Sequence, residues 1–336
     1  MTRDALAPYA RPHVGRSVLD LATSVVPYVA LTVLGYVLFD VAGVWAALAV
    51  APLAGGFLLR TYIMFHDCAH GSFLPSKRGN VWLGRFLGIV VWTPYAKWKH
   101  DHAVHHATSG DLDRRGTGDV TTWTVAEYKG KSWKGRLGYR LFRNPLVMFG
   151  LGPIWGLMIQ PRRTGKNDRP RLRNSVHLTN AALLVVVGAI LWLVGWQAWL
   201  AVQFPAMFLA AAAGVWLFYV QHQFEDAYWE NADSWSYADA ALQGSSHLDL
   251  PQPLQWFSGN IGLHHVHHLS ARVPNYHLQA AHDNVEVFRD VPRLSMWEGV
   301  KAARLKLWDE DARRLVTWAE VRPGVAPRAH ASQQSA

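Results

Sequence analysis

The chain has 336 residues, of which 50% are hydrophobic and only 17% are charged, and it contains 17 tryptophans. This composition is more apolar than that of an ordinary soluble protein and indicates a membrane protein. The formal net charge of +9 is compatible with a partner that is anionic lipid or an acidic protein. The sequence carries no zinc-finger or RNA-binding signature, which argues against nucleic acid.

Four apolar runs follow a polar N-terminal segment, residues 1–17. They cover residues 18–39, 44–65, 176–194 and 198–220. At ~1.5 Å per residue, a helix of about 20 residues crosses the ~30 Å hydrocarbon layer. The short breaks at 40–43 and 195–197 predict that the runs form two helical hairpins. Arg60, near the end of the second run, is expected to reach the membrane surface.

The segment between the hairpins is basic, because residues 60–175 carry 20 Lys and Arg against 7 Asp and Glu. Neither hairpin turn carries Lys or Arg, so the positive-inside rule puts this segment in the cytoplasm. We therefore expect an all-α integral membrane protein with four transmembrane helices. Both chain ends, and a helical cap formed by residues 66–175 and 221–321, are expected on the cytoplasmic side.

Three further stretches have weaker patterns. Residues 81–95 and 145–159 are too short or too interrupted to span and are predicted to be interfacial helices. Near the C-terminus, large apolar residues recur at helical spacing and predict an amphipathic helix or an ordinary core-facing stripe: Trp297, Val300, Trp308, Leu315 and Trp318. Residues 322–336 are predicted to be a disordered tail.

Histidines are concentrated in three short motifs, HDCAH at 66–70, HAVHH at 102–106 and HHVHH at 264–268. On a helix, residues i and i+4 share a face, so His66 and His70 are predicted to bind one metal ion together. In the other two motifs the spacing is i, i+3, i+4, and each is predicted to aim three imidazoles at one point: His102, His105 and His106, and His264, His267 and His268. His222 lies just past the fourth apolar run. All nine histidines are expected on the cytoplasmic side.

Crowded imidazoles repel one another when protonated, so a packed group near neutral pH needs a metal ion to occupy its nitrogens. Eight or nine ligands exceed what one ion takes, which implies two ions. All-imidazole coordination suits zinc, copper, iron or nickel. Two irons that reduce O2 could oxidise a C–H bond of an acyl chain entering from the lipid, whereas zinc has no redox chemistry. A zinc carrier is the alternative, although its histidines would be expected inside the spans.

Four phrases carry a resemblance to a known family: HDCAHGSFLPSKRGN, WKHDHAVHHATSGDLDRRGTGDV, FYVQHQFEDAYWE and LQWFSGNIGLHHVHHLSARVPNY. In order and spacing they resemble the membrane fatty acid desaturases, most closely the bacterial acyl-lipid delta-12 or omega-6 type. The resemblance implies a single desaturase domain over residues 18–321 in a bacterial inner membrane. It also implies that two iron ions are bound by His66, His70, His102, His105, His106, His222, His264, His267 and His268.

The activity implied by this resemblance is desaturation of a lipid-linked fatty acyl chain, with O2 as co-substrate and a cis double bond as product. No catalytic side chain is expected besides the metal ligands. The same ligands could serve a hydroxylase or ketolase that acts on an alkane, a sterol or a carotenoid, and this is the alternative function.

Residues beside the motifs are candidates for holding the ligands in place. A carboxylate can accept the outer N–H of a ligating histidine, and Asp67 is the first candidate, followed by Asp101, Glu225, Asp226 and Asn260. In acyl-CoA relatives an asparagine precedes the additional histidine by four residues, and here that position is Phe218. His100 and His265 lie outside the family pattern.

Electrons are expected from a separate donor such as a ferredoxin with its reductase, because the single cysteine, Cys68, cannot supply the thiolates of an iron–sulfur cluster. Basic residues of the middle segment could attract an acidic donor or bind anionic lipid headgroups: Lys129, Lys131, Lys134, Arg136, Arg140, Arg143, Arg162 and Arg163. Candidate walls of an acyl tunnel, or else interfacial anchors, are Trp82, Trp92, Trp98, Trp256 and Tyr276.

Overall fold

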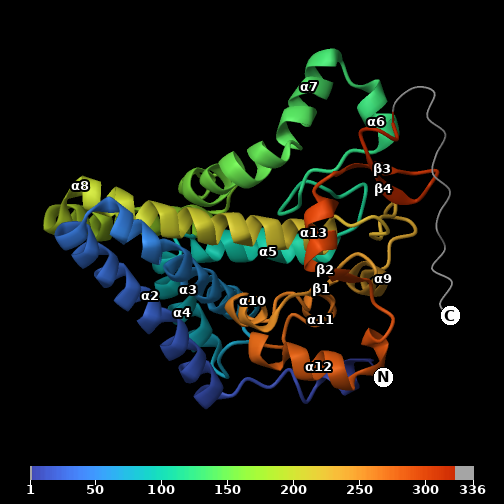
Figure 1. The fold of residues 1–336 in the computed structure, drawn as a ribbon. Coiled ribbons are helices and arrows are strands. Elements are labelled where there is room, and N and C mark those ends of the chain that lie inside the picture. The colour runs from blue at the N-terminus through green and yellow to red at the C-terminus, as the bar shows by residue number, and fades with distance from the viewer. Residues whose placement is uncertain (1, 322–336) are drawn as a thin grey trace.

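The structure is a computed structural model that describes residues 2–321, so the predicted disordered tail at 322–336 lies outside the described residues (Figure 1). After the short helix α1 (Thr2–Leu6), three helices in the described part are long and apolar enough to cross a membrane: α2 (Val14–Ala42), α3 (Val44–His70) and α8 (Pro170–His222). Many of their apolar side chains are exposed, including Val29, Leu184 and Trp192. Such faces are suited to lipid.

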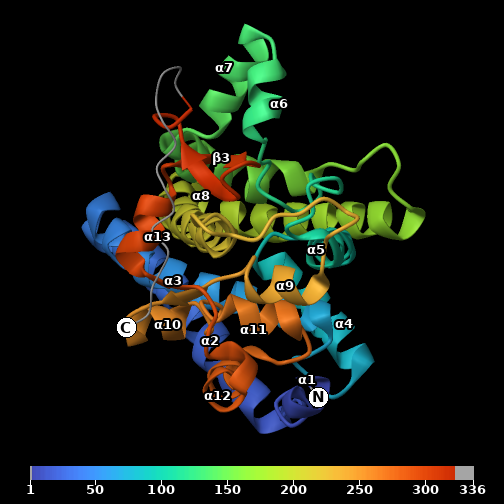
Figure 2. The same ribbon diagram turned by 90° about the vertical axis from the view of Figure 1, so that its right-hand side faces the viewer.

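The helix α8 contains the third and fourth predicted runs. Its 53 residues would measure about 80 Å as one straight helix, more than twice a hydrocarbon layer. Gly195 interrupts it with φ 79° and ψ 161°, inside the predicted break at 195–197. In Figure 2 the first half runs across the view and the second half is seen end-on. The described chain therefore has four apolar helical segments in three helices, and the predicted second hairpin was wrong, because the two halves of α8 lie at a large angle and do not run antiparallel.

The helices α2 and α3 form the first predicted hairpin. They are joined by the single residue Gly43, whose φ of 83° is in the left-handed region that a glycine adopts without strain. The second half of α8 packs against both, and small residues permit the close approach. A Cβ atom at Gly55 of α3 would lie 3.0 Å from the carbonyl oxygen of Ala206 in α8.

Arg60 does not reach the membrane surface, and that expectation was wrong. Its side chain in α3 is only 5% exposed, and Nη2 donates to Oδ1 of Asp20 in α2 at 2.9 Å. The guanidinium also lies 4.0 Å from the ring centroid of Trp256. Because a counter-charge is available on the adjacent helix, the cation is satisfied inside the protein and joins both helices to the Trp256 segment.

The segment between α3 and α8 contains four α-helices and three short helices of other types. In chain order these are α4 (Lys77–Val90), α5 (Tyr95–Thr108), α6 (Val125–Gly130) and α7 (Trp133–Phe142), followed by the π-helices η1 (Val147–Leu151) and η2 (Ile154–Ile159) and the 3-10 helix η3 (Gln160–Arg162). The predicted interfacial helix at 81–95 is therefore wrong as one element. The chain breaks at Trp92, with φ 56°, and α5 starts after Pro94.

The part after α8 is built from short elements. They are α9 (Tyr237–Leu242), β1 (His247–Asp249), α10 (Gln252–Phe257), α11 (His264–Leu269), η4 (Asn275–His277), α12 (Leu278–Asn284), η5 (Glu286–Phe288), β2 (Arg293–Ser295), α13 (Met296–Ala302), β3 (Leu305–Asp309) and β4 (Arg314–Thr317). The strands β1 and β2 pair in parallel, and β3 and β4 pair antiparallel. The expectation of an all-α chain was thus wrong for these two small sheets.

The apolar pattern near the C-terminus is divided between a helix and a hairpin. Trp297 and Val300 lie on α13 and are exposed, whereas Trp308 in β3 and Leu315 in β4 are buried and face each other in register. The predicted amphipathic helix is therefore wrong beyond Ala302. The polar stretch between the strands forms a tight turn with Arg313 at φ 50°, which ends any helix and turns the chain back on itself.

We predict that Asp20→Ala strongly destabilises the protein, because it leaves the Arg60 charge buried and unpaired. Removing one partner of a buried ion pair costs about 3–5 kcal/mol. The measurement is the temperature at which half of the detergent-purified protein loses its monodisperse peak in size-exclusion chromatography. The double variant Asp20→Leu/Arg60→Met is the control and should stay close to the wild type. Equal midpoints for the single variant and the wild type would contradict the structural role of this pair.

Candidate metal centre

Four helices bring the nine predicted histidines together. His66 and His70 lie on the last turns of α3, which continues to His70. The second motif lies on α5 and the third on α11, while His222 is the last residue of α8. Apolar helices from the N-terminal and central parts of the chain thus end at one place, where α5 and α11 meet them.

The nine histidines form two groups in which the potential ligand nitrogens lie within 4.8 Å of one another. The first group consists of His66, His70, His102, His106 and His267, and the second consists of His105, His222, His264 and His268. No member of the predicted set is missing from the two groups. We call them the five-histidine group and the four-histidine group.

The two three-histidine motifs are each divided between the groups, so the expectation that each aims three rings at one point was wrong. On an α-helix, residues i and i+4 lie about 40° apart, whereas residue i+3 lies about 60° away on the other side. On α5 the pair His102 and His106 therefore faces one group, and His105 faces the other. On α11 the assignment is reversed. The pair His264 and His268 belongs to the four-histidine group with His105, and the single residue His267 belongs to the five-histidine group.

The rings within each group are in close contact. In the five-histidine group, Nε2 of His106 lies 3.1 Å from Nε2 of His102 and 2.9 Å from Nε2 of His267. In the four-histidine group, Nε2 of His222 lies 2.9 Å from Nε2 of His264. The Nε2 atoms of these five histidines thus face one another within their groups.

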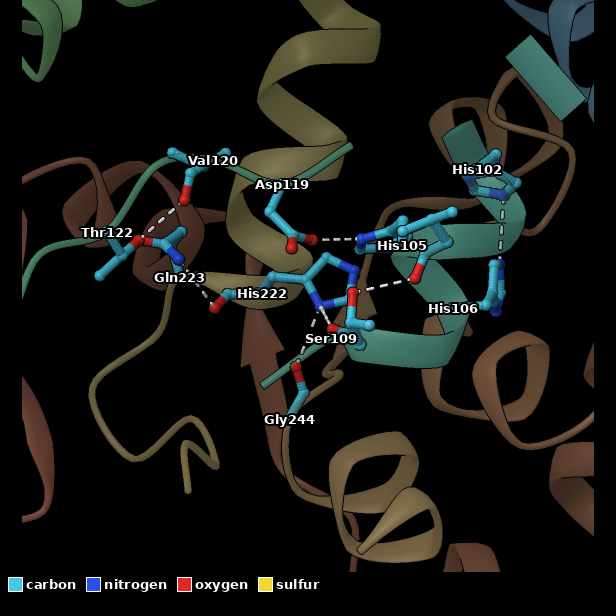
Figure 3. A network of polar contacts seen from close by, with 12 residues as sticks. His102, His105, His106, Ser109, Asp119, Val120, Thr122, His222, Gln223 and Gly244 are labelled. Carbon is cyan, nitrogen blue, oxygen red and sulfur yellow. Dashed lines mark hydrogen bonds and ion pairs between the residues drawn. The ribbon is translucent and has the colours of Figure 1, made fainter. Parts of the chain in front are cut away.

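The outer nitrogens of three rings are held by oxygen acceptors. Nδ1 of His66 lies 3.1 Å from Oδ1 of Asp67, as expected from the sequence. Nδ1 of His222 donates to the carbonyl oxygen of Gly244 at 3.0 Å. Nδ1 of His105 makes a short contact with Oδ1 of Asp119, which Figure 3 shows beside α5. In a neutral ring, donation from Nδ1 leaves the lone pair of Nε2 free for a metal ion.

Asp119 was missed by the sequence reasoning because it lies 14 residues from its histidine, in a loop between α5 and α6. Gly118 allows the loop to approach α5 closely. A Cβ atom at Gly118 would lie 3.0 Å from Cβ of His105. The φ of Gly118 is 75°, in the left-handed region that favours glycine. The only signal in the sequence was the glycine-rich phrase RRGTGD, which does not indicate its partner.

Other predicted acceptors have different partners. Both carboxylate oxygens of Asp101 accept from Lys97, and Oε1 of Glu225 accepts from Arg314. Asn260 donates to the carbonyl oxygen of Asn275. Asp226 lines a surface hollow together with Trp308. Of the five candidates, only Asp67 has a histidine contact among these interactions.

The two extra histidines join neither group. His100 is exposed on α5. His265 is buried next to His264, but its Nε2 lies 2.9 Å from Nδ1 of His282 on α12, away from both centres.

Burial fits the two groups for metal ions. The Nε2 atoms of His66, His70, His105 and His268 are buried and make no hydrogen bond in the described part of the chain. Buried nitrogens of this kind are costly unless an electrophile occupies them. Burial and then the neighbouring histidines lower the pKa of the ligand candidates on α5 and α11 well below 6.5: His102, His106, His264, His267 and His268. The rings are therefore neutral at pH 7, as metal ligands must be.

Two aromatic rings border the groups. Trp98 stacks on His102 with ring centroids 4.3 Å apart. The ring centroid of Phe218 lies 5.0 Å from that of His105 and 5.3 Å from that of His222. Of the predicted wall residues, Trp98 contacts the histidine rings. Trp256 instead covers Arg60, and Trp92 stacks on Trp199. Phe218 thus places an apolar ring, and not the side-chain amide of an asparagine, next to the four-histidine group.

Comparison with known proteins agrees with this architecture. The family model described as fatty acid desaturase matches residues 43–299. A fatty acid desaturase of Bacillus subtilis (strain 168) is 44% identical over 317 residues, which cover 94% of this chain and 90% of the relative. More distant relatives include two proteins of Synechocystis sp. An sn-1 acyl-lipid omega-3 desaturase (ferredoxin) is 28% identical, with 70% of this chain and 66% of the relative covered. An sn-1 oleoyl-lipid 12-desaturase is 26% identical, with 80% and 74% covered.

The matched segment contains all nine histidines of the two groups and two of the three long apolar helices, α3 and α8. The family match covers most of the chain, and the Bacillus subtilis relative matches nearly end to end. The chain therefore belongs to the fatty acid desaturase family.

Proposed function

We propose that this protein introduces a cis double bond into the acyl chain of a membrane lipid, using O2 and two electrons from a separate donor. The observation that carries the proposal is the pair of buried histidine groups at the ends of apolar helices. The names of the two Synechocystis relatives specify acyl-lipid and oleoyl-lipid substrates, which supports a lipid-linked chain here. In balance, one CH2–CH2 unit, O2, two electrons and two protons give one CH=CH unit and two waters.

Each histidine group is proposed to hold one iron ion, the five-histidine group through its five Nε2 atoms and the four-histidine group through its four. Buried Nε2 atoms without a hydrogen-bond partner in the described residues fit a divalent metal, and iron is among the metals that imidazole suits. When bound, the two irons supply the redox chemistry by which O2 removes two neighbouring hydrogens from an unactivated chain. The contributions of the protein itself are orientation and exclusion of water.

Asp67, Asp119 and Gly244 perform the orientation. By accepting the Nδ1–H of three rings, they fix which nitrogen points inward, and a carboxylate also raises the basicity of its ring. Asp67 is itself held, because its Oδ2 accepts from the backbone N–H of Asn275 at 2.7 Å. Trp98 and Phe218 offer apolar faces next to the two groups, against which a methylene chain can lie without bringing water with it.

The proposed topology has four transmembrane segments, α2, α3 and the two halves of α8, in a bacterial inner membrane. The histidine groups lie where α3 and α8 end. The basic segment 60–175 runs along the chain from the last turns of α3 to the first turns of α8. The positive-inside rule then puts the groups and both chain ends in the cytoplasm. A cytoplasmic site would be accessible to a soluble electron donor, and the printed name of one relative includes ferredoxin.

The direct test is the fatty-acid profile of a bacterial host that expresses this chain together with a ferredoxin and its reductase. A new unsaturated fatty acid, seen by gas chromatography of the methyl esters, is expected from the wild type. His105→Ala should abolish it, because the four-histidine group loses a ligand. His100→Ala is the matched control and should retain the product, since His100 is exposed and outside both groups. A hydroxylated product would instead identify the chain as a hydroxylase and refute desaturation.

We predict that Asp119→Asn and Asp67→Asn each weaken metal binding by about 10–100-fold, as expected when a carboxylate partner of a ligating histidine is lost. The measurement is the amount of iron per chain that remains after equilibration with increasing concentrations of a chelator. Asp101→Asn is the control, because its carboxylate contacts Lys97 and no histidine. If all three variants retain iron like the wild type, the proposed role of the two carboxylates is wrong.

A further inference from the structure

The segment that includes α7 projects from the body of the protein and exposes a row of large apolar side chains. We call residues 131–163 the arm; Figure 1 shows it leaving the body at α6 and returning to the side of α8. On α7, Trp133, Leu137 and Leu141 are 65%, 48% and 54% exposed. Their spacing of four residues puts them on one face of the helix. The opposite face carries Tyr139, which is buried against the body.

The apolar row continues along the rest of the arm. Leu146, Leu151, Trp155 and Ile159 are 83%, 62%, 52% and 44% exposed. So many large exposed apolar side chains in one short segment are uncommon on a protein face that contacts only water, and they mark a site of contact with another apolar phase.

Cations flank this row. The chain contains no acidic residue between Glu127 and Asp168. Lys134 lies beside the ring of Trp133, and Arg163 lies beside the ring of Trp155. Not every cation of the segment is available, since Arg143 is fully buried and Arg162 bonds to Trp92 and Asn180. The available charges are on Lys129, Lys131, Lys134, Arg136 and Arg163.

The end of the arm is fixed beside a membrane helix. Nη1 of Arg162 donates to the side chain of Asn180 in the first half of α8 at 3.0 Å, and the side chain of Asn180 donates back to the carbonyl oxygen of Arg162 at 2.9 Å. About one turn further along α8, Leu184 is 77% exposed on an apolar surface. The apolar row of the arm therefore starts beside lipid-facing helix and extends outward from it.

We propose that the arm lies in the headgroup layer of an anionic leaflet. Trp133, Leu137 and Leu141 insert among the acyl chains, and the flanking cations bind lipid phosphates. Tryptophan near each end, a series of large exposed apolar side chains and basic flanks without an acidic residue in the same segment are the properties of a segment that binds in the plane of a membrane. An acidic protein partner would match the charges, but it would not account for an apolar row continuous with α8.

The base of the arm is tied to the four-histidine group. Arg143, at the end of α7, donates to Thr122 Oγ1 at 3.2 Å and to Gln223 Oε1 at 2.8 Å. Gln223 follows His222, and Thr122 lies three residues after Asp119, as Figure 3 shows. Attachment of the arm to the membrane would thus hold this side of the histidine groups at a fixed depth relative to the lipid.

The test uses a fluorescent label at position 137. Because the only native cysteine, Cys68, is fully buried, Leu137→Cys can be labelled selectively with an environment-sensitive dye, and the unlabelled wild type serves as the background. The full chain is placed in nanodiscs of phosphatidylcholine with or without phosphatidylglycerol. The expected result is a blue-shifted emission that is quenched about twofold or more by lipids spin-labelled in their acyl chains. Glu310→Cys, in the exposed turn between β3 and β4, is the control and should show neither effect.

Charge is tested in the same labelled protein. Replacement of Lys131, Lys134 and Arg136 by Gln should reduce the quenching in phosphatidylglycerol discs to the level seen with phosphatidylcholine alone. If position 137 is quenched no more than position 310, the arm is not in the membrane and the proposal is overturned. Emission that shifts only after an acidic ferredoxin is added would overturn it as well, in favour of a protein partner. Neither readout requires catalysis, so failure here is distinguishable from failure of the proposed desaturation.

Discussion

The angular spacing of residues on an α-helix is the constraint on which the two histidine groups depend. In each three-histidine motif, the i and i+4 rings share one direction and the i+3 ring has another. Because α5 and α11 face each other, the pair on one helix meets the single ring on the other, and two centres arise from two identical motifs. A histidine from α8 and two from α3 complete them. Shifting either motif by one residue would break both groups.

Nine buried imidazoles are tolerated only because their charge and hydrogen bonds are controlled. Burial and mutual proximity keep five of the rings neutral, since each has a pKa well below its ordinary value: His102, His106, His264, His267 and His268. Backbone and carboxylate acceptors then decide which nitrogen faces the centre. The same principle applies at Arg60, whose buried charge is matched by Asp20. At both places a buried basic side chain therefore has a polar partner from a neighbouring segment.

Local periodicity was enough to predict the apolar helices, the break at Gly195 and the nine histidines that meet, because hydrophobic runs and i, i+4 spacing are properties of a single segment. Contacts between segments were not accessible in this way. The acceptors Asp119 and Gly244 lie on loops whose position is set by packing, and only Asp67, adjacent to its histidine, was predicted. The β3–β4 hairpin was missed because its apolar residues also fit a helical period, and the turn at Arg313 decides between them.

The division of the histidines along the chain also sets an order on assembly during synthesis. Four of the five rings in the first group precede residue 107, whereas only His105 of the second group does. Each group still needs at least one ring from α11, near residue 264 and beyond. Neither group can be complete while the ribosome is translating the first three quarters of the message, so all the long apolar helices are made before either group has its full set of rings.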